Sequence, residues 1–177
     1  MSWGSEAQLA AVAFGCGPGS FTGVRIAASA AQGIALARGT PVIAVSSLAC
    51  LAAGALRLDA AADVVVATIA GRKGEMYTCA YARGSVHRDL PVALGAEVAV
   101  PIETYVREPS SARVVICGDA MDAVLTRVPH AQGIDWRHPH AQDLLRIARA
   151  GSSDGDLAAA LPVYLEGSGQ WRKLGER

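Results

Sequence analysis

Residues 20–38 constrain the fold more than any other segment, because they predict a helix with almost no polar surface. A helix on the surface of a globular protein normally has a wide polar face, whereas one that is apolar nearly all round is buried. Two apolar rows run along the predicted helix. One row contains only glycine and alanine, and the other alternates isoleucine with alanine: Gly23, Ala27, Ala31 and Ala35, then Ile26, Ala30, Ile34 and Ala37.

Two explanations of this helix remain open. The chain itself could cover every side of the helix, or a second chain could cover one face. The row of small residues favours close approach of another helix, because no side chain larger than a methyl group intervenes. We therefore name a candidate partner interface that consists of Gly23, Ala27, Ala31 and Ala35 together with Arg25 and Ile34.

The segments around this helix predict an α/β fold. An apolar strand is expected over residues 9–14, a glycine cluster follows over 15–19, and Ser20 is expected to cap a helix that ends near Arg38. A second strand over 42–45 precedes a helix capped by Ser46 or Ser47 that ends near Leu56. A strand–helix–strand–helix order predicts parallel strands joined by helical crossovers.

Charge divides the chain near Asp59. Residues 1–58 contain only Glu6, Arg25, Arg38 and Arg57, so 28 of the 32 charged residues lie in the remaining 119 positions. We expect residues 1–58 to form part of an N-terminal lobe and 59–166 a C-terminal lobe, with 167–177 as a mobile tail.

The predicted C-terminal lobe contains a hairpin and three helices. The hairpin strands are expected over 64–69 and 75–81, and another strand over 113–117. Helices are expected over 101–107, 119–127 and 140–150. The last of these has an apolar face that is expected to point inward: Leu144, Leu145, Ile147 and Ala148.

The glycine-rich loop could hold an anion, because free backbone N–H groups before a helix can cradle a phosphate. The sequence of the loop and the first helical turn is Gly17-Pro18-Gly19-Ser20-Phe21-Thr22. It lacks the lysine of a Walker A loop and the third glycine of a dinucleotide fingerprint. It also offers no evident acid to hold Mg²⁺. A tight structural turn is one interpretation, and a nucleotide- or phosphate-binding enzyme that uses the Gly15–Gly19 loop is the other.

Composition excludes several functional classes. The formal net charge is zero and 51% of the residues are hydrophobic, so neither a strongly basic nucleic-acid binder nor a disordered tail is expected. The four cysteines lie far apart, which predicts buried thiols, and the histidine spacing predicts no metal site: Cys16, Cys50, Cys79 and Cys117, with His87, His130, His138 and His140. No signal peptide or membrane-spanning run is evident, so we expect a cytoplasmic protein without a cofactor.

Residues 17–48 closely resemble the TsaB (YeaZ) family. The resemblance is carried by Gly17-Pro18-Gly19-Ser20-Phe21-Thr22-Gly23-Val24-Arg25, by Ala31-Gln32-Gly33-Ile34-Ala35 and by the strand that leads into Ser46-Ser47-Leu48. Looser matches follow at Arg72, Glu75 and Tyr77 and at Leu161-Pro162-Val163-Tyr164-Leu165. Ala70 stands where the family has aspartate, and Glu166 where a basic residue is common.

The resemblance implies an actin-like, sugar-kinase type of fold with two lobes. It also implies that the first lobe is incomplete, because the family's opening strand with its Ile-Asp-Thr-Ser-type motif has no counterpart here. The implied function is a non-catalytic dimerisation subunit that supports TsaD in threonylcarbamoyl transfer to adenosine 37 of tRNA. Besides a TsaD-like subunit, the resemblance leaves room for a TsaE-like ATPase and for a homodimer, and it implies no direct sequence-specific contact with nucleic acid.

Overall fold

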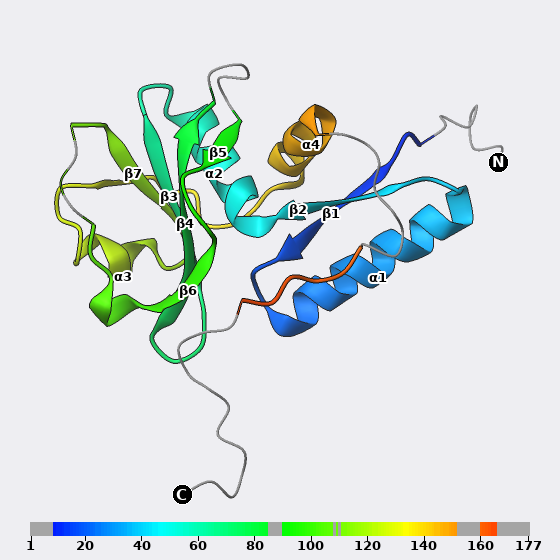
Figure 1. Ribbon diagram of the computed structural model, residues 1–177, viewed down its shortest axis with the longest axis horizontal. Coiled ribbons are helices and arrows are strands. Elements are labelled where there is room, and N and C mark those ends of the chain that lie inside the picture. The colour runs from blue at the N-terminus through cyan, green and yellow to red at the C-terminus, as the bar shows by residue number, and fades with distance from the viewer. Residues whose placement is uncertain (1–8, 85–89, 108, 110, 152–159, 166–177) are drawn as a thin grey trace, which may run out of the picture.

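The computed structural model describes residues 9–84, 90–107, 109, 111–151 and 160–165. It contains two β-sheets flanked by helices (Figure 1). In chain order the elements are β1 (Val12–Gly17), α1 (Phe21–Arg38), β2 (Val42–Ser46), α2 (Ser47–Leu58), β3 (Val64–Ala70), β4 (Glu75–Arg83), β5 (Pro91–Ala93), β6 (Val98–Pro101), the 3-10 turn η1 (Ile102–Thr104), β7 (Val114–Gly118), α3 (Met121–Leu125), β8 (Gln132–Gly133) and α4 (Ala141–Ala150).

The first sheet confirms the predicted parallel pairing. β1 and β2 run parallel, with Val12 opposite Val42 and Gly15 opposite Val45. The Ser20 hydroxyl accepts a hydrogen bond from the Gly23 N–H at 3.4 Å, so Ser20 caps α1 as expected. α1 ends at Gly39, whose φ of 62° lies in the left-handed region that glycine adopts without strain. β1 begins later than predicted and includes the first residues of the glycine cluster, because these residues continue the pairing with β2.

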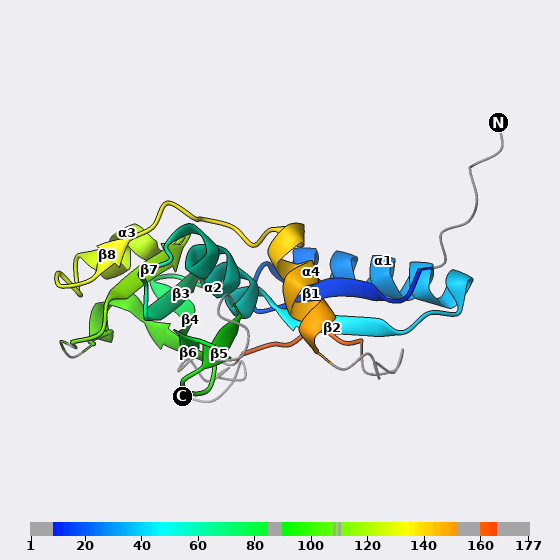
Figure 2. The ribbon, with the colours of Figure 1, turned by 90° about the horizontal axis from the view of Figure 1, so that it is seen from above.

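One face of α1 packs on the first sheet. Four of its residues are buried there: Val24, Ala28, Ala31 and Ala35. The last three form a cluster with Phe14, Cys16 and Val42. α4 lies on the other side of the β1–β2 pair, as Figures 1 and 2 show together. The pair of strands is therefore covered by one helix from each half of the chain.

The second sheet has the order β5-β4-β3-β7-β8, and β6 also pairs with β4. The predicted hairpin is confirmed, since β3 and β4 are antiparallel with Val65 opposite Tyr81. β7 runs parallel to β3. α2 packs on one face of this sheet through Leu48, Leu51 and Leu56, and α3 packs on the other.

The two sheets follow one another in sequence, but the helices do not divide in the same way. β1 and β2 precede residue 58, and every described strand of the second sheet follows it. α2 nevertheless packs on the second sheet, and residues 160–165 return to the first, where Ala160 joins the α1 cluster. Each sheet therefore packs against a segment that belongs to the other half of the chain.

Several predicted elements of the second half need correction. The helix expected over 101–107 is only the turn η1, and the helix expected over 119–127 is limited to α3. In α4, Leu145 is 50% exposed whereas Asp143 is fully buried, so the inward face differs from the predicted one. The short strands β5, β6 and β8 were not predicted. The tail 167–177 lies outside the described residues.

No helix within the described ranges is long and apolar enough to cross a lipid bilayer.

Candidate functional site

The side of α1 that faces away from the sheet is a continuous exposed surface rich in apolar side chains. We call it the outer face of α1 and define it as Thr22, Ile26, Ser29, Ala30, Gly33, Ile34, Leu36 and Ala37. Its three large side chains, Ile26, Ile34 and Leu36, are 64%, 49% and 73% exposed. Acidic residues are missing from α1, and no described part of the chain buries this face.

The structure corrects part of the interface predicted from the sequence. Ala31 and Ala35 are 4% and 1% exposed, so they pack inside this chain and cannot contact a partner without unfolding it. Ala27 is half-buried at the edge of the same cluster. Gly23, Arg25 and Ile34 are exposed. The row at positions 23, 27, 31 and 35 therefore runs from the surface into the core, and the open surface is the isoleucine–alanine row beside it.

Gly17 and Val163 join residues 160–165 to the start of α1. The Val163 N–H donates to the Cys16 carbonyl at 2.8 Å. A Cβ on Gly17 would lie only 2.8 Å from the Val163 carbonyl oxygen, and the φ of Gly17 is 111°. Glycine is required here for both reasons. Pro18 and Gly19 then form the link to the cap residue Ser20.

Phe21 and Tyr164 flank Arg25 at the N-terminal end of α1. The guanidinium carbon of Arg25 lies 3.4 Å from the centroid of the Phe21 ring and 5.5 Å from that of Tyr164. Arg25 Nε donates a hydrogen bond to the Tyr164 hydroxyl at 2.8 Å. A shallow groove lined by Phe21, Arg25, Ile26 and Ala30 continues from this cluster along the helix.

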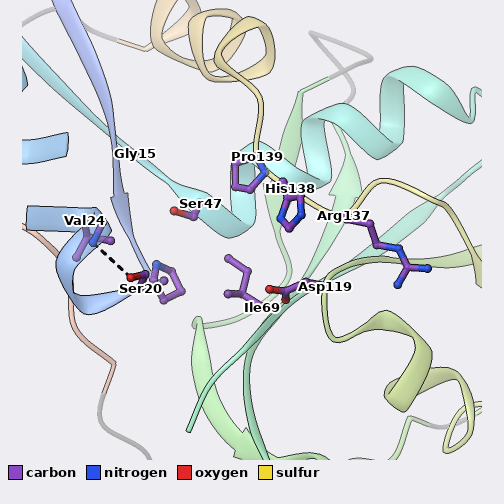
Figure 3. A pocket seen from close by; sticks show the side chains of 12 residues that line it. Gly15, Ser20, Val24, Ser47, Ile69, Asp119, Arg137, His138 and Pro139 are labelled. Carbon is purple, nitrogen blue, oxygen red and sulfur yellow. Dashed lines mark hydrogen bonds between the residues drawn. The ribbon is translucent and has the colours of Figure 1, made fainter. Parts of the chain in front are cut away.

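The glycine loop borders a cleft between the two sheets (Figure 3). The cleft has a volume of about 270 Å³. Its lining combines the loop with residues from both halves of the chain: Gly15, Pro18, Gly19, Ser20, Gly23, Val24, Ser47, Ile69, Asp119, Arg137, His138 and Pro139. The loop expected to bind phosphate or to form a turn therefore lies at an open site.

The charges around this cleft disfavour a bound anion. Asp119 faces the loop across the cleft and accepts a hydrogen bond from the Ala70 N–H at 2.7 Å, so an acid does lie near the loop, contrary to the sequence-based expectation (Figure 3). Arg137 is the only arginine or lysine among the described lining residues, and it points away. It pairs with Asp122 at 2.6 Å and with Asp135 at 2.8 Å, and the bonds to these carboxylates raise its pKa.

Glu97 forms a polar contact between the halves that the sequence did not reveal. Its carboxylate accepts hydrogen bonds from the hydroxyls of Ser46 and Tyr81, the latter at 2.6 Å. Burial, and then the bond to Glu97, raises the pKa of Tyr81. Ser46 also caps α2 by accepting from the N–H groups of Leu48 and Ala49. These residues are far apart in sequence, and no local pattern marks them as a cluster.

The cysteines and the described histidines lie in ordinary structural environments. All four cysteines are free and buried, as predicted, and burial raises the pKa of Cys50 to about 11 and that of Cys117 to about 12. Among the described residues, no three His, Cys, Asp or Glu side chains gather as metal ligands would. His140 stacks on Trp136 with ring centroids 4.0 Å apart, and His87 lies outside the described residues.

Comparison with known proteins gives a consistent result. A family model described as TsaD, tRNA N6-adenosine threonylcarbamoyltransferase, matches residues 4–120. The tRNA threonylcarbamoyladenosine biosynthesis protein TsaB of Escherichia coli is 36% identical, over 96% of this chain and 76% of its own length. The protein of the same name from Haemophilus influenzae is 33% identical, over 94% of this chain and 74% of its own length.

Solved structures agree with the sequence relatives. YeaZ from Pseudomonas aeruginosa superimposes with a TM-score of 0.74 at 36% identity, over 88% of this chain and 74% of that one. A crystal structure of a P. aeruginosa protein described as similar to peptidase YEAZ gives a TM-score of 0.77, also at 36% identity, over 89% of this chain and 74% of that one. The expected actin-like fold is thereby confirmed. The chain therefore belongs to the TsaB (YeaZ) family.

Proposed function

We propose that this chain is a non-catalytic accessory subunit that supports a TsaD-type subunit in threonylcarbamoyl transfer to adenosine 37 of tRNA. Relatives at 36% and 33% identity are named as tRNA threonylcarbamoyladenosine biosynthesis proteins, which supports this pathway. The proposed mechanism is burial of the outer face of α1 against helices of the TsaD-type subunit. Such docking would order the partner's active site.

The exposure of the outer face of α1 carries this proposal. Ile26, Ile34 and Leu36 are each about half exposed or more, on a helix whose opposite side is fully packed. Small residues lie between them: Ala30, Gly33 and Ala37. Because these side chains project little from the helix, a partner helix can approach closely. Burying such a surface stabilises a complex by about 25 cal/mol for each Å² of apolar area removed from water.

The chemistry of the described side chains supports an accessory role. The cysteines have raised pKa values, so they are poor nucleophiles at neutral pH. Arg137 is committed to two aspartates beside the glycine loop. We assign the loop residues Gly17 to Thr22 a structural role, which is to begin α1 and to set its direction.

A nucleotide- or phosphate-binding enzyme is the second candidate, because the glycine loop and Asp119 line the same cleft. Asp119 could hold a magnesium ion that neutralises a phosphate. Calorimetry with ATP and magnesium tests this alternative. Micromolar affinity for this chain alone favours it, and no heat of binding up to millimolar ATP contradicts it.

A reconstituted reaction tests the accessory role. Purified TsaD-type subunit from the same organism is supplied with its threonylcarbamoyl donor and tRNA, with and without this chain. We expect modification of tRNA to require both proteins and this chain alone to transfer nothing. Transfer by this chain alone, or full activity of the partner without it, contradicts the proposal. Adding a TsaE-like ATPase to the same reaction tests whether it contributes to the modification. Gel filtration of this chain alone tests whether it forms a homodimer.

A further inference from the structure

Arg25 adds a positive charge beside the outer face of α1, so this surface can select a partner by charge, which its apolar side chains cannot do. Residues 21–38 contain no aspartate or glutamate, and their two charged residues are Arg25 and Arg38. Arg38 lies in the last turn, where a positive charge interacts favourably with the helix dipole. Arg25 is the fifth residue of α1, near the positive end of the helix dipole, so the dipole does not favour a positive charge at this position.

The guanidinium of Arg25 is held in one orientation. Phe21 lies against its face and Tyr164 accepts a hydrogen bond from its Nε. Tyr164 is itself placed by residues 160–165, because Val163 bonds to Cys16 and the Ala160 carbonyl accepts from Gln32 Nε2 at 2.8 Å. Arginine that is fixed in this way loses little conformational entropy when it binds a ligand.

Within the described ranges, no side chain or carbonyl group bonds to the two terminal nitrogens of Arg25. Among the described residues, no carboxylate forms an ion pair with Arg25: the Phe21 and Tyr164 rings lie against its guanidinium, and the Tyr164 hydroxyl accepts from its Nε. The two terminal nitrogens of an arginine form a fork that matches a carboxylate. This fork lies at the edge of the groove formed with Ile26 and Ala30.

We propose that Arg25 binds an acidic side chain on a helix of the partner whose apolar side chains cover Ile26 and Ala30. This inference rests on the function proposed above and narrows the partner surface to an apolar helix face with an aspartate or glutamate at its edge. A second copy of this chain fits less well, because its α1 offers no carboxylate and adds two further arginines.

Affinity measurements with the TsaD-type subunit test this contact. Arg25→Glu reverses the charge, and Arg38→Glu is the matched control at the far end of the same helix. Arg25→Lys keeps the charge but loses the planar fork. We expect Arg25→Glu to raise Kd by about 100-fold and Arg25→Lys by about tenfold, and Arg38→Glu by less than about threefold. A steeper salt dependence of Kd for the wild type than for Arg25→Gln is expected as well.

The outcomes separate this inference from the function on which it rests. If Ile26→Asp abolishes the complex while Arg25→Glu and Arg25→Lys bind as the wild type does, the Arg25 contact is wrong and the proposed interface stands. If Ile26→Asp also binds normally, the interface itself is wrong. Equal weakening by Arg25→Glu and Arg38→Glu means a general charge effect and contradicts the specific contact. A tight homodimer that excludes the TsaD-type subunit would overturn the choice of partner. Thermal melting of each variant confirms that it is folded.

Discussion

The Asp143 carboxylate is fully buried and accepts two hydrogen bonds from the Arg57 guanidinium, from Nε at 3.0 Å and from Nη2 at 3.2 Å. Arg146, in the same helix as Asp143, also reaches this carboxylate, at 3.5 Å. Asp143 belongs to α4, which covers the first sheet, and Arg57 belongs to α2, which covers the second. The pair therefore links these two helices. This contact and the bond between Ser46 and Glu97 each connect the first half of the chain to the second.

Asp143→Asn should destabilise the protein by about 2 kcal/mol. The amide cannot accept two charge-assisted bonds, and the partly exposed arginines recover only part of the loss from water. Asp122→Asn is the matched control, because Asp122 pairs with Arg137 at the surface. Chemical denaturation measures both. If both substitutions lower the free energy of unfolding by the same small amount, the buried Asp143 pair is no more stabilising than the exposed Asp122 pair, which would contradict the prediction.

Asp59 and Arg113 predict a pH-dependent contribution to stability. The bond to Arg113 lowers the pKa of Asp59 below its ordinary value of 3.8. A carboxyl whose pKa is lowered by folding stabilises the native state above its unfolded pKa, and this contribution disappears as the pH falls through the folded pKa. Asp59→Asn should therefore cost about 0.5 kcal/mol at pH 7 and progressively less below pH 4.

Thermal melting across pH checks this pair. Arg113→Gln should show the same pH profile as Asp59→Asn, and the double variant should lose nothing more. A loss that stays constant from pH 7 to the lowest pH at which the protein folds would contradict the assignment to the ion pair.

Gly54 and Gly33 should respond in opposite ways to alanine. Both lie inside helices, where alanine normally stabilises by about 0.5–1 kcal/mol. A Cβ on Gly54 would overlap the indole ring of Trp136, whereas one on Gly33 would meet no atom within 4 Å. We expect Gly33→Ala to stabilise by that amount and Gly54→Ala to destabilise by about 2 kcal/mol with a change in tryptophan fluorescence. Stabilisation by Gly54→Ala would contradict the packing of Trp136.

Ala31 and Ala30 test which side of α1 is open. Ala31 is buried in the cluster on the first sheet, and its neighbour Ala30 is exposed. Ala31→Glu places a charge in that core and should prevent stable folding, whereas Ala30→Glu should leave the melting temperature within a few degrees of the wild type. A folded, soluble Ala31→Glu variant would mean that α1 packs with a different face.

The sequence predicted elements whose signals are local. Ser20 was predicted as a cap, and Ser46 as one of two candidates with Ser47, because capping depends on a polar side chain immediately before an apolar helix. The parallel pairing of β1 with β2 followed from the helix between them. The sequence predicted that α1 is apolar nearly all round, but it did not predict which side packs on the sheet. Glycine and alanine occupy several faces of the helix and leave no hydrophobic gradient that would mark the buried side.

Features that depend on distant partners were missed. Asp143 was not among the residues predicted to point inward, because its burial becomes favourable only when Arg57 of a distant helix lies beside it. Glu97 meets Ser46 and Tyr81 only after the two sheets come together. Asp119 follows β7, far from the glycine loop in sequence, so its place in the same cleft depends on the complete fold.

The affinity of this chain for the TsaD-type subunit from the same organism tests the central claim most directly. Ile26→Asp places a charge at the centre of the outer face of α1, and Leu94→Asp is the control, since Ile26 and Leu94 are 64% and 55% exposed on different surfaces. The account predicts that Ile26→Asp raises Kd by at least about 100-fold with an unchanged melting temperature, while Leu94→Asp binds as the wild type does. Unchanged binding by Ile26→Asp would contradict it.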